Sequence, residues 1–479
     1  MTNTAGTATF TGNISAANLT LSGIGGTLHL GTGLTHTFSG IVARTNGTLN
    51  FGSSTVSLSN ATPFSGTVAT LVAGTSTINY SGAAQPVLDF TYNNLILSGS
   101  GVKTTSASVV VNGRLTLEGT ASLSAAITYG GEASLRYNRT TPVTTSDFEF
   151  PSLFQSSGGV IIGGTGLITL NGDKVITAPL IIETGAQLSL STFTGSSSKG
   201  LTLGGTPQTP GTYGGNTSAA GTINSTFFAD ATGILNVTAP DATWLGITSD
   251  WSDPANWSIG SVPDLTTNAL INSGTPFQPV LTAASDCASL IVGAGASLTT
   301  AGFALGIYGN FTNSGTVTLG SSNITIGGGL TQSIAAITTT GNITVTKTSG
   351  TATFNGNVSA NSLTLNGTGG TLSLGLLRTH TFTGNITVTA GTLTGGTSNV
   401  VLTGTADQSI AGFTTTGTLT STKTGGTATL TGNISMGALI VNGTGGTVNL
   451  GTGTTHTLSG NLTLTAGVLQ GGSANLVVT

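Results

Sequence analysis

The chain is short of charge, cysteine and long apolar runs. Only 5% of its 479 residues are charged, against roughly a quarter in an ordinary soluble domain. Ten basic and 14 acidic residues give a net charge of −4, which leaves no basic patch to neutralise nucleic-acid phosphates. Cys287 is the single cysteine, so no disulfide forms within the chain. No uncharged apolar run approaches the roughly 20 residues that a membrane-spanning helix needs.

What the chain has instead is glycine, 75 residues of it, with threonine, serine and asparagine at most other polar positions. Val, Ile, Leu and Phe recur in short runs that alternate with Thr or Ser, the period-two pattern of half-buried β-strands. Glycine and asparagine end these runs, as expected at turns. Apolar residues spread this evenly favour a stack of short β-segments with a thin continuous core over one globular core.

One long phrase occurs three times, and its copies are Gly6–Gly40, Gly350–Gly384 and Gly426–Gly460. The first two copies agree at 24 of 35 positions, and the last two are offset by 76 positions. Repetition of β-type segments at a fixed period predicts a stacked, quasi-one-dimensional fold. Because both chain ends fall inside repeats, we expect the chain to be a segment of a longer protein.

The 76-residue repeat divides at glycine-rich turns into four pieces of similar length. We interpret each piece as one coil of a right-handed parallel β-solenoid, an all-β fold with about 19 residues per coil and four coils per repeat. Parallel stacking gives each backbone N–H and C=O a partner on the next coil, about 4.8 Å away. An array of antiparallel β-sandwiches is the alternative interpretation.

Composition changes near residue 240, where Ala239-Pro240 suggests a hinge. We predict a first solenoid block over 1–238, a Trp-rich capping segment over 239–285 and a second solenoid block over 286–479. An open coil stack exposes its core at the ends, so solenoids need atypical covering segments. The predicted structural cap consists of Trp244, Trp251, Trp257 and Pro263.

Three histidines occupy the same place in the repeated phrase: His36, His380 and His456. Four coils separate the last two, about 19 Å at sheet spacing, so they cannot share one metal ion. We interpret all three as coil-surface or turn residues, and we expect His29 to point outward.

Clusters of acids are the remaining candidates for chemistry. Asp241, Asp250, Asp253 and Asp264 lie in the Trp-rich segment, where carboxylates and loop carbonyls could bind calcium, although turn formation is the simpler interpretation. A second cluster contains Arg136, Arg139, Asp147 and Glu149. Paired acids serve glycosidases, but no catalytic signature surrounds them, so we predict neither catalytic residues nor a cofactor, and no enzyme.

The Trp-rich segment resembles one common in very large secreted surface proteins of Bacteroidetes. A Cys-x-x-Leu-x-(Ile/Val) element follows in both, here at Cys287–Val292, and Tyr92–Thr104 is similar to another of their phrases. The positions that carry the resemblance are Trp244, Gly246, Ser249, Asp250, Trp251, Pro254, Asn256, Trp257, Gly260 and Pro263.

This resemblance implies a cell-surface adhesin exported by the type IX system, similar to the repetitive adhesins of gliding bacteria. We therefore expect an extracellular, stiff filament that attaches to surfaces, other cells or polysaccharide, with surface glycans or substratum, other copies of itself, and the secretion and motility machinery as partners. The alternative is a self-assembling structural protein of a sheath, surface layer or extracellular fibre.

Overall fold

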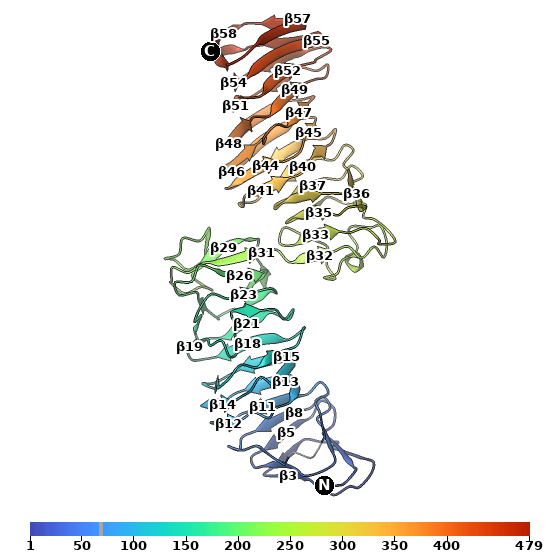
Figure 1. Cartoon of the computed structure of the whole chain (residues 1–479), viewed down its shortest axis with the longest axis vertical. Helices are drawn as coiled ribbons and strands as arrows, with labels where there is room; N and C mark the ends of the chain where they lie inside the picture. The colour runs from blue at the N-terminus through green and yellow to red at the C-terminus, as the bar shows by residue number, and fades with distance from the viewer. Residues whose placement is uncertain (67–69) are drawn as a thin grey trace. The chain divides into compact units, whose positions relative to one another are not determined.

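The structure, a computed structural model, describes residues 1–66 and 70–479. Nearly all regular structure is β, and the described residues contain one short helix, η1 (Pro254–Asn256). Parallel strands stack into a β-solenoid of about 23 turns, which confirms the predicted fold class. The chain divides into two compact units, Met1–Thr238 and Ala239–Thr479 (Figure 1). None of the described helices is long and apolar enough to cross a membrane.

Each turn of the second unit contributes three strands. One such turn consists of β43 (Ile343–Val345), β44 (Thr351–Phe354) and β45 (Val358–Ala360). Alternate residues of these strands are buried, because successive side chains of a strand point to opposite faces. The following strands pair with them in parallel: β46 (Leu363–Ser373), β47 (Thr379–Phe382), β48 (Ile386–Gly396), β49 (Asn399–Leu402), β50 (Gln408–Ile410), β51 (Phe413–Thr415) and β52 (Thr418–Ser421).

The pairing register refines the predicted period. Beyond the Trp-rich segment, residues that pair across consecutive turns of the second unit lie 19 to 24 positions apart, as for Leu305 with Ile324 and Ile386 with Ile410. From Ile343, three turns on one face lead to Ile410. The residue 76 positions from Ile343 is Leu419, two strands beyond that point. The repeat therefore occupies three and two-thirds turns rather than four, because each strand-bearing side of a turn averages nearly seven residues.

The first unit is less regular. Its longest sheet runs through ten successive parallel strands: β2 (Ile14–Ala16), β5 (Thr35–Phe38), β8 (Thr55–Leu58), β11 (Thr77–Tyr80), β13 (Thr91–Leu97), β15 (Val110–Leu117), β18 (Ser134–Arg139), β21 (Val160–Gly164), β24 (Leu180–Ile182) and β27 (Leu201–Leu203). Along it the distance between paired residues falls to 17 positions for Thr77 and Asn94 and rises to 25 for Leu135 and Val160. Turns of unequal length cannot present flat faces, so this unit has local projections and recesses.

The first unit ends in antiparallel structure. β28 (Thr206–Pro207) folds back on β27, and β29 (Gly211–Gly214) pairs antiparallel with β31 (Leu235–Thr238). β31 in turn stacks in parallel on β26 (Ser196–Lys199). Residues between β27 and β31 thus leave the solenoid path and return to it, and they cover the last turns of the unit, at its green end in Figure 1.

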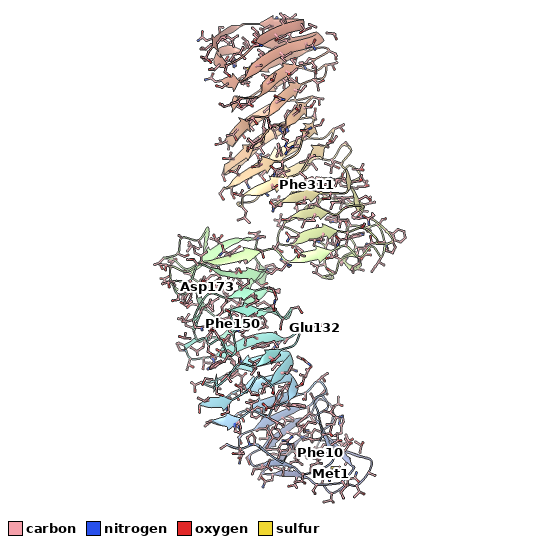
Figure 2. The ribbon with its side chains drawn as sticks, in the orientation of Figure 1. Met1, Phe10, Glu132, Phe150, Asp173 and Phe311 are labelled. Carbon is pink, nitrogen blue, oxygen red and sulfur yellow. The ribbon has the colours of Figure 1, made fainter. Side chains whose placement is uncertain are left out.

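Each unit has its own hydrophobic core. The core of the second unit runs without interruption from Ala242 to Leu458, and the predicted inward residue Leu374 is 1% exposed. The core of the first unit extends from Leu21 to Val237. Phe150 in the first unit and Phe311 in the second, both labelled in Figure 2, are among the buried core residues. The interior is therefore packed with side chains along each stack.

Candidate binding site

The Trp-rich segment forms one packed cluster at the beginning of the second unit. The rings of Trp244 and Trp251 each meet Trp257 edge to face, with centroids 5.0 and 4.7 Å apart. Trp257 Nε1 donates to the Trp251 carbonyl over 2.8 Å, and all three side chains are at most 1% exposed. Pro263 is also buried. The cluster belongs to the same core as the solenoid turns that follow it, the arrangement that a cap requires; its effect on stability stays a prediction.

Three of the four acids of this segment organise turns, and the fourth, Asp241, lies in a strand. Asp253 Oδ1 accepts from the Ala255 N–H at the start of η1, and Asp264 Oδ1 accepts from the Thr266 N–H. Hydrogen bonds from the Thr282 hydroxyl and the Ser252 N–H lower the pKa of Asp250. Asp241 lies beside Asn268, 2.9 Å from Oδ1 to Nδ2. Among the described residues no three His, Cys, Asp or Glu side chains come together as metal ligands.

The three repeated histidines lie in the core, which corrects their prediction as surface or turn residues. His36, His380 and His456 are each 0% exposed. In each, Nε2 lies 2.7 to 2.8 Å from a carbonyl oxygen six residues earlier, and Nδ1 accepts from a backbone N–H of the preceding turn. The ring therefore links neighbouring turns through its two nitrogens. The pattern Thr-His-Thr-Phe contains the missed signal: Phe382 points inward, so the residue two positions before it must do so too. His29, in contrast, is only partly buried.

The structure contains a recurring hydrogen-bonded pair of a buried lysine and a glutamine, which the sequence analysis did not predict. Lys103, Lys347 and Lys423 are buried, and each ammonium donates to backbone carbonyls and to a glutamine Oε1 on the preceding turn. Burial lowers the pKa of Lys103 and of Lys347 to about 8. A lysine in a sequence predicts a surface position, and the carbonyls that accept its hydrogen bonds come together only when turns stack.

The charged residues at 132–149 are also structural. Arg136 pairs with Glu183, 2.6 Å apart, and Arg139 donates to the Gly119 carbonyl of the preceding turn. The other members, Asp147 and Glu149, accept hydrogen bonds from Lys174 and Tyr137 respectively. Each of these carboxylates is thus engaged with a different partner.

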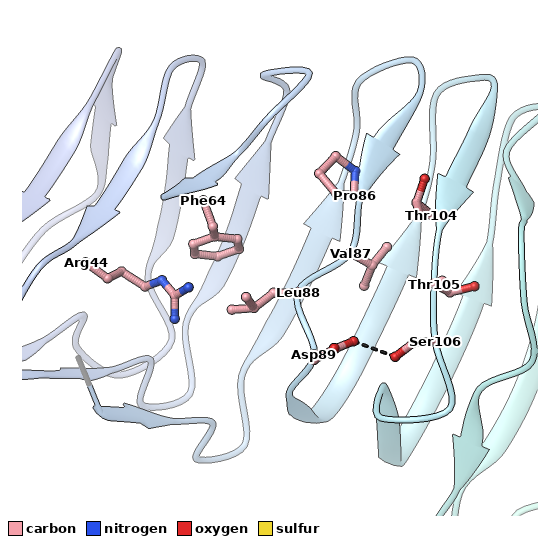
Figure 3. Close-up of a pocket in the computed structure, with 9 residues that line it drawn as sticks. All are labelled: Arg44, Phe64, Pro86, Val87, Leu88, Asp89, Thr104, Thr105 and Ser106. Atoms are coloured by element: carbon pink, nitrogen blue, oxygen red, sulfur yellow. Dashed lines mark hydrogen bonds between the residues drawn. The ribbon is translucent and has the colours of Figure 1, made fainter. Parts of the chain in front are cut away.

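A hollow of about 600 Å³ lies on one face of the first unit (Figure 3). It lies where this face changes sheet: β9 (Phe64–Ser65) ends one sheet, and β12 (Gln85–Pro86) begins the next. The turn that carries β12 is the short one, in which Thr77 pairs with Asn94. The shortest spacing along the longest sheet of this unit thus coincides with the interruption of this face. The volume of the hollow falls within the range of small-molecule sites, about 300–1,000 Å³.

One end of the hollow is cationic. Arg44, the last residue of β6 (Val42–Arg44), is 6% exposed, and its guanidinium carbon lies 5.3 Å from the centre of the Phe64 ring. One amino group donates to the Gly66 carbonyl over 2.7 Å, whereas Nε is buried without a hydrogen-bond partner. Burial lowers the pKa of Arg44. Neither of the ion pairs Arg136–Glu183 and Lys174–Asp147 includes Arg44.

The opposite end is polar. Asp89 is exposed, and its Oδ1 accepts a hydrogen bond from the Ser106 hydroxyl over 2.5 Å. Thr104 and Thr105 lie beside it on the next turn. Between the two ends the wall is apolar, formed by Phe64, Pro86, Val87 and Leu88 (Figure 3). The hollow therefore combines a cation, an apolar wall and a set of hydroxyl and carboxylate groups.

Two buried tyrosines hold this wall in place. The hydroxyls of Tyr80 and Tyr92 lie 2.7 Å apart; Tyr80 accepts from the Leu88 N–H, and Tyr92 donates to the Leu88 carbonyl. Both rings are at most 1% exposed, and burial raises the pKa of Tyr80 to about 12. The two tyrosine hydroxyls thus hold both backbone polar groups of Leu88, so this part of the wall is fixed by the fold itself.

Comparisons with protein families, with curated proteins and with solved structures give no match for this chain.

Proposed function

We propose that the chain is part of a secreted cell-surface adhesin, a stiff filament whose outer faces make many weak contacts with surfaces, cells or polysaccharide. The observation that carries this proposal is the repeat register. Because each repeat covers three and two-thirds turns, successive copies of the same phrase lie on different faces of the second unit and so point in different directions. His380 stacks on Val400, in the column of Leu419, whereas Thr457, next to His456, stacks on Ser435 in another column.

The composition of those faces supports the same proposal. Outward positions are mostly Thr, Ser and Asn, and residues 350–479 contain only three charged residues, Arg378, Asp407 and Lys423. Lys423 is buried as well. Uncharged hydroxyl and amide groups on a rigid scaffold suit repeated weak binding, which becomes strong when many contacts act together. The resemblance to gliding-bacterial adhesins adds export by the type IX system to the proposal, and with it an extracellular location and a role without catalysis.

The test is attachment under flow. Beads coated with the purified chain should be retained on polysaccharide-coated glass, and retention should rise steeply with coating density, because binding is multivalent. Retention equal to that of beads coated with albumin would refute the adhesive role. Electron micrographs of the same preparation test the alternative: isolated thin rods support a filament, and a continuous lattice would instead support a self-assembling sheath or surface layer. Release of reducing sugar from the polysaccharide would contradict the absence of catalysis.

A further inference from the structure

Arg44 borders the hollow as a buried cation, and neither ion pair of the described residues includes it. Removing a guanidinium from water costs free energy unless it is paired and hydrogen-bonded. Within residues 1–66 and 70–479, Arg44 donates one hydrogen bond, to the Gly66 carbonyl, and its Nε is buried without a partner at a residue exposure of 6%. A cation at this position is not a feature of every turn, since the preceding turn has Leu21 at the position that pairs with Arg44. A ligand carboxylate in the hollow would supply the missing charge.

The rest of the wall restricts what the carboxylate can be attached to. Phe64 and Leu88 form an apolar surface next to the guanidinium (Figure 3), and such a surface suits the C–H face of a sugar ring. Asp89 and Ser106 at the far end can accept and donate hydrogen bonds to hydroxyl groups. A second anionic group at that end would meet the Asp89 carboxylate and be repelled. The lining thus favours a ligand with one carboxylate and several hydroxyls.

We propose that this hollow binds a single uronic acid residue of an acidic polysaccharide, with its carboxylate on Arg44 and its hydroxyls on Asp89 and Ser106. The proposal rests on the adhesive function for the source of the ligand, and it names the substrate class of one site within it. The bidentate fork of arginine matches a carboxylate in geometry as well as charge. Asp89 also distinguishes this site from one for heavily sulfated glycans.

The experiment is calorimetric titration of the complete chain with a trigalacturonic acid probe and with its methyl ester, which has the same sugar rings without the charges. We expect saturable binding of the acid, and binding of the ester that is about tenfold to hundredfold weaker, because a charge-assisted pair is lost. Equal binding of the two probes, tighter binding of a sulfated trisaccharide, or no heat from the acid at millimolar concentration would each overturn the proposal.

Variants assign the binding to the hollow. Arg44→Gln should weaken binding of the acid to the level of the ester. Asp89→Asn, a change at an exposed residue, should weaken binding of the uncharged ester by about threefold to tenfold through lost hydroxyl contacts. Arg378→Gln in the second unit removes the same charge far from the hollow in sequence and should bind like the parent chain. If Arg44→Gln fails to fold, as circular dichroism would reveal, Asp89→Asn decides alone: unchanged affinity for the ester contradicts the site.

Bead retention separates this proposal from the filament function. Arg44→Gln beads that still adhere to a neutral polysaccharide, while the chain no longer binds trigalacturonic acid, support both. Parent beads that adhere while the parent chain binds no trigalacturonic acid refute the uronic acid site and leave the adhesive function standing. If the parent chain binds trigalacturonic acid but beads coated with it do not adhere, the adhesive function is refuted and the uronic acid site stands.

Discussion

The two units are built from the same phrase and differ in how strictly they keep its spacing. In the second unit, paired residues beyond the Trp-rich segment stay 19 to 24 positions apart, and its faces continue with little interruption. In the first unit the spacing falls to 17 for Thr77 and Asn94, and one face breaks there between β9 and β12. The hollow, the tyrosine pair and the unpaired Arg44 all lie at this break. In this chain, turns of even length accompany a continuous stack of strands, and the short turn accompanies a hollow on the face.

Charge follows the same division. The first unit contains 15 charged residues and the second unit nine. The ion pairs Arg136–Glu183 and Lys174–Asp147 both lie in the first unit. In the second unit two of the nine, Lys347 and Lys423, are buried lysines that repeat one arrangement, with backbone carbonyls as acceptors. The first unit therefore contains charged contacts that occur once, whereas most buried polar contacts of the second unit recur with the repeat.

The largest effect is expected from a charge placed in the continuous core of the regular unit. Leu374→Asp buries an unpaired carboxylate and should cost about 4 kcal/mol or more. Leu376→Asp introduces the same charge at a side chain that is 68% exposed and should cost almost nothing. Thermal unfolding with limited proteolysis measures both. Because the cores are separate, peptides of the first unit should stay protected in Leu374→Asp, and equal protease sensitivity in the two variants would contradict the inward assignment.

Removing a cap tryptophan should have the next largest effect. Trp257→Ala deletes a ring in contact with both other tryptophans and should cost about 3–5 kcal/mol, concentrated in the first turns of the second unit. Leu245→Ala, at a neighbouring residue that is 45% exposed, is the control. Hydrogen exchange of residues 268–292 reports the loss locally. Unaltered exchange there would show that the Trp cluster does not stabilise the start of the unit.

The repeated histidines test whether the two units use the phrase alike. His380→Leu removes one acceptor and one donor from buried backbone groups and should cost about 1–3 kcal/mol, whereas Thr379→Ala, at an outward position of the same strand, should cost little. His36→Leu in the first unit should match His380→Leu within about 0.5 kcal/mol, since its contacts are the same. Denaturant titration of these variants and the parent chain decides. A much larger cost in one unit would show that irregular turns change the value of the same bond.

The smallest effect concerns pH. Burial lowers the pKa of Lys103 and Lys347 to about 8, while the unfolded chain keeps a lysine pKa near 10.4. Between these values the unfolded state binds more protons, so stability should rise as the pH rises from 8 to 9.5. The carbonyls around each ammonium favour its charged form and keep the slope small. Midpoints of urea unfolding measure it, and the double variant Lys103→Met, Lys347→Met should abolish the rise. A fall with pH would contradict the assigned direction.

How much of this was predictable depends on the kind of information that each feature needs. Alternation of apolar and hydroxyl residues and the glycine turns sufficed for the parallel solenoid. Strand parity also contained the inward position of His380, because Phe382 lies two residues beyond it. The number of strands per turn is not written in the repeat length, so the sequence predicted four turns where the register has three and two-thirds.

The hollow lay beyond sequence reasoning for a different reason. Arg44, Phe64 and Asp89 lie on separate turns, and they come together only because the turn between Thr77 and Asn94 is short. In the sequence this stretch looks like an ordinary coil, because its length differs little from the expected one. The buried lysines are similar, since their carbonyl partners belong to the preceding turn. Features made by stacking need the register, which pairs residues that no local pattern connects.

Because a repeat is not a whole number of turns, successive repeats of the second unit are related by a screw rotation. An inserted or deleted repeat therefore rotates the faces that follow it. A phrase returns to its original side only after three repeats, which is eleven turns or about 53 Å at sheet spacing. Excising one repeat would leave every downstream strand with a partner, yet it would swing the remaining surface by a third of a revolution. Recombination between copies could thus re-aim everything distal to the junction without altering a single buried contact type.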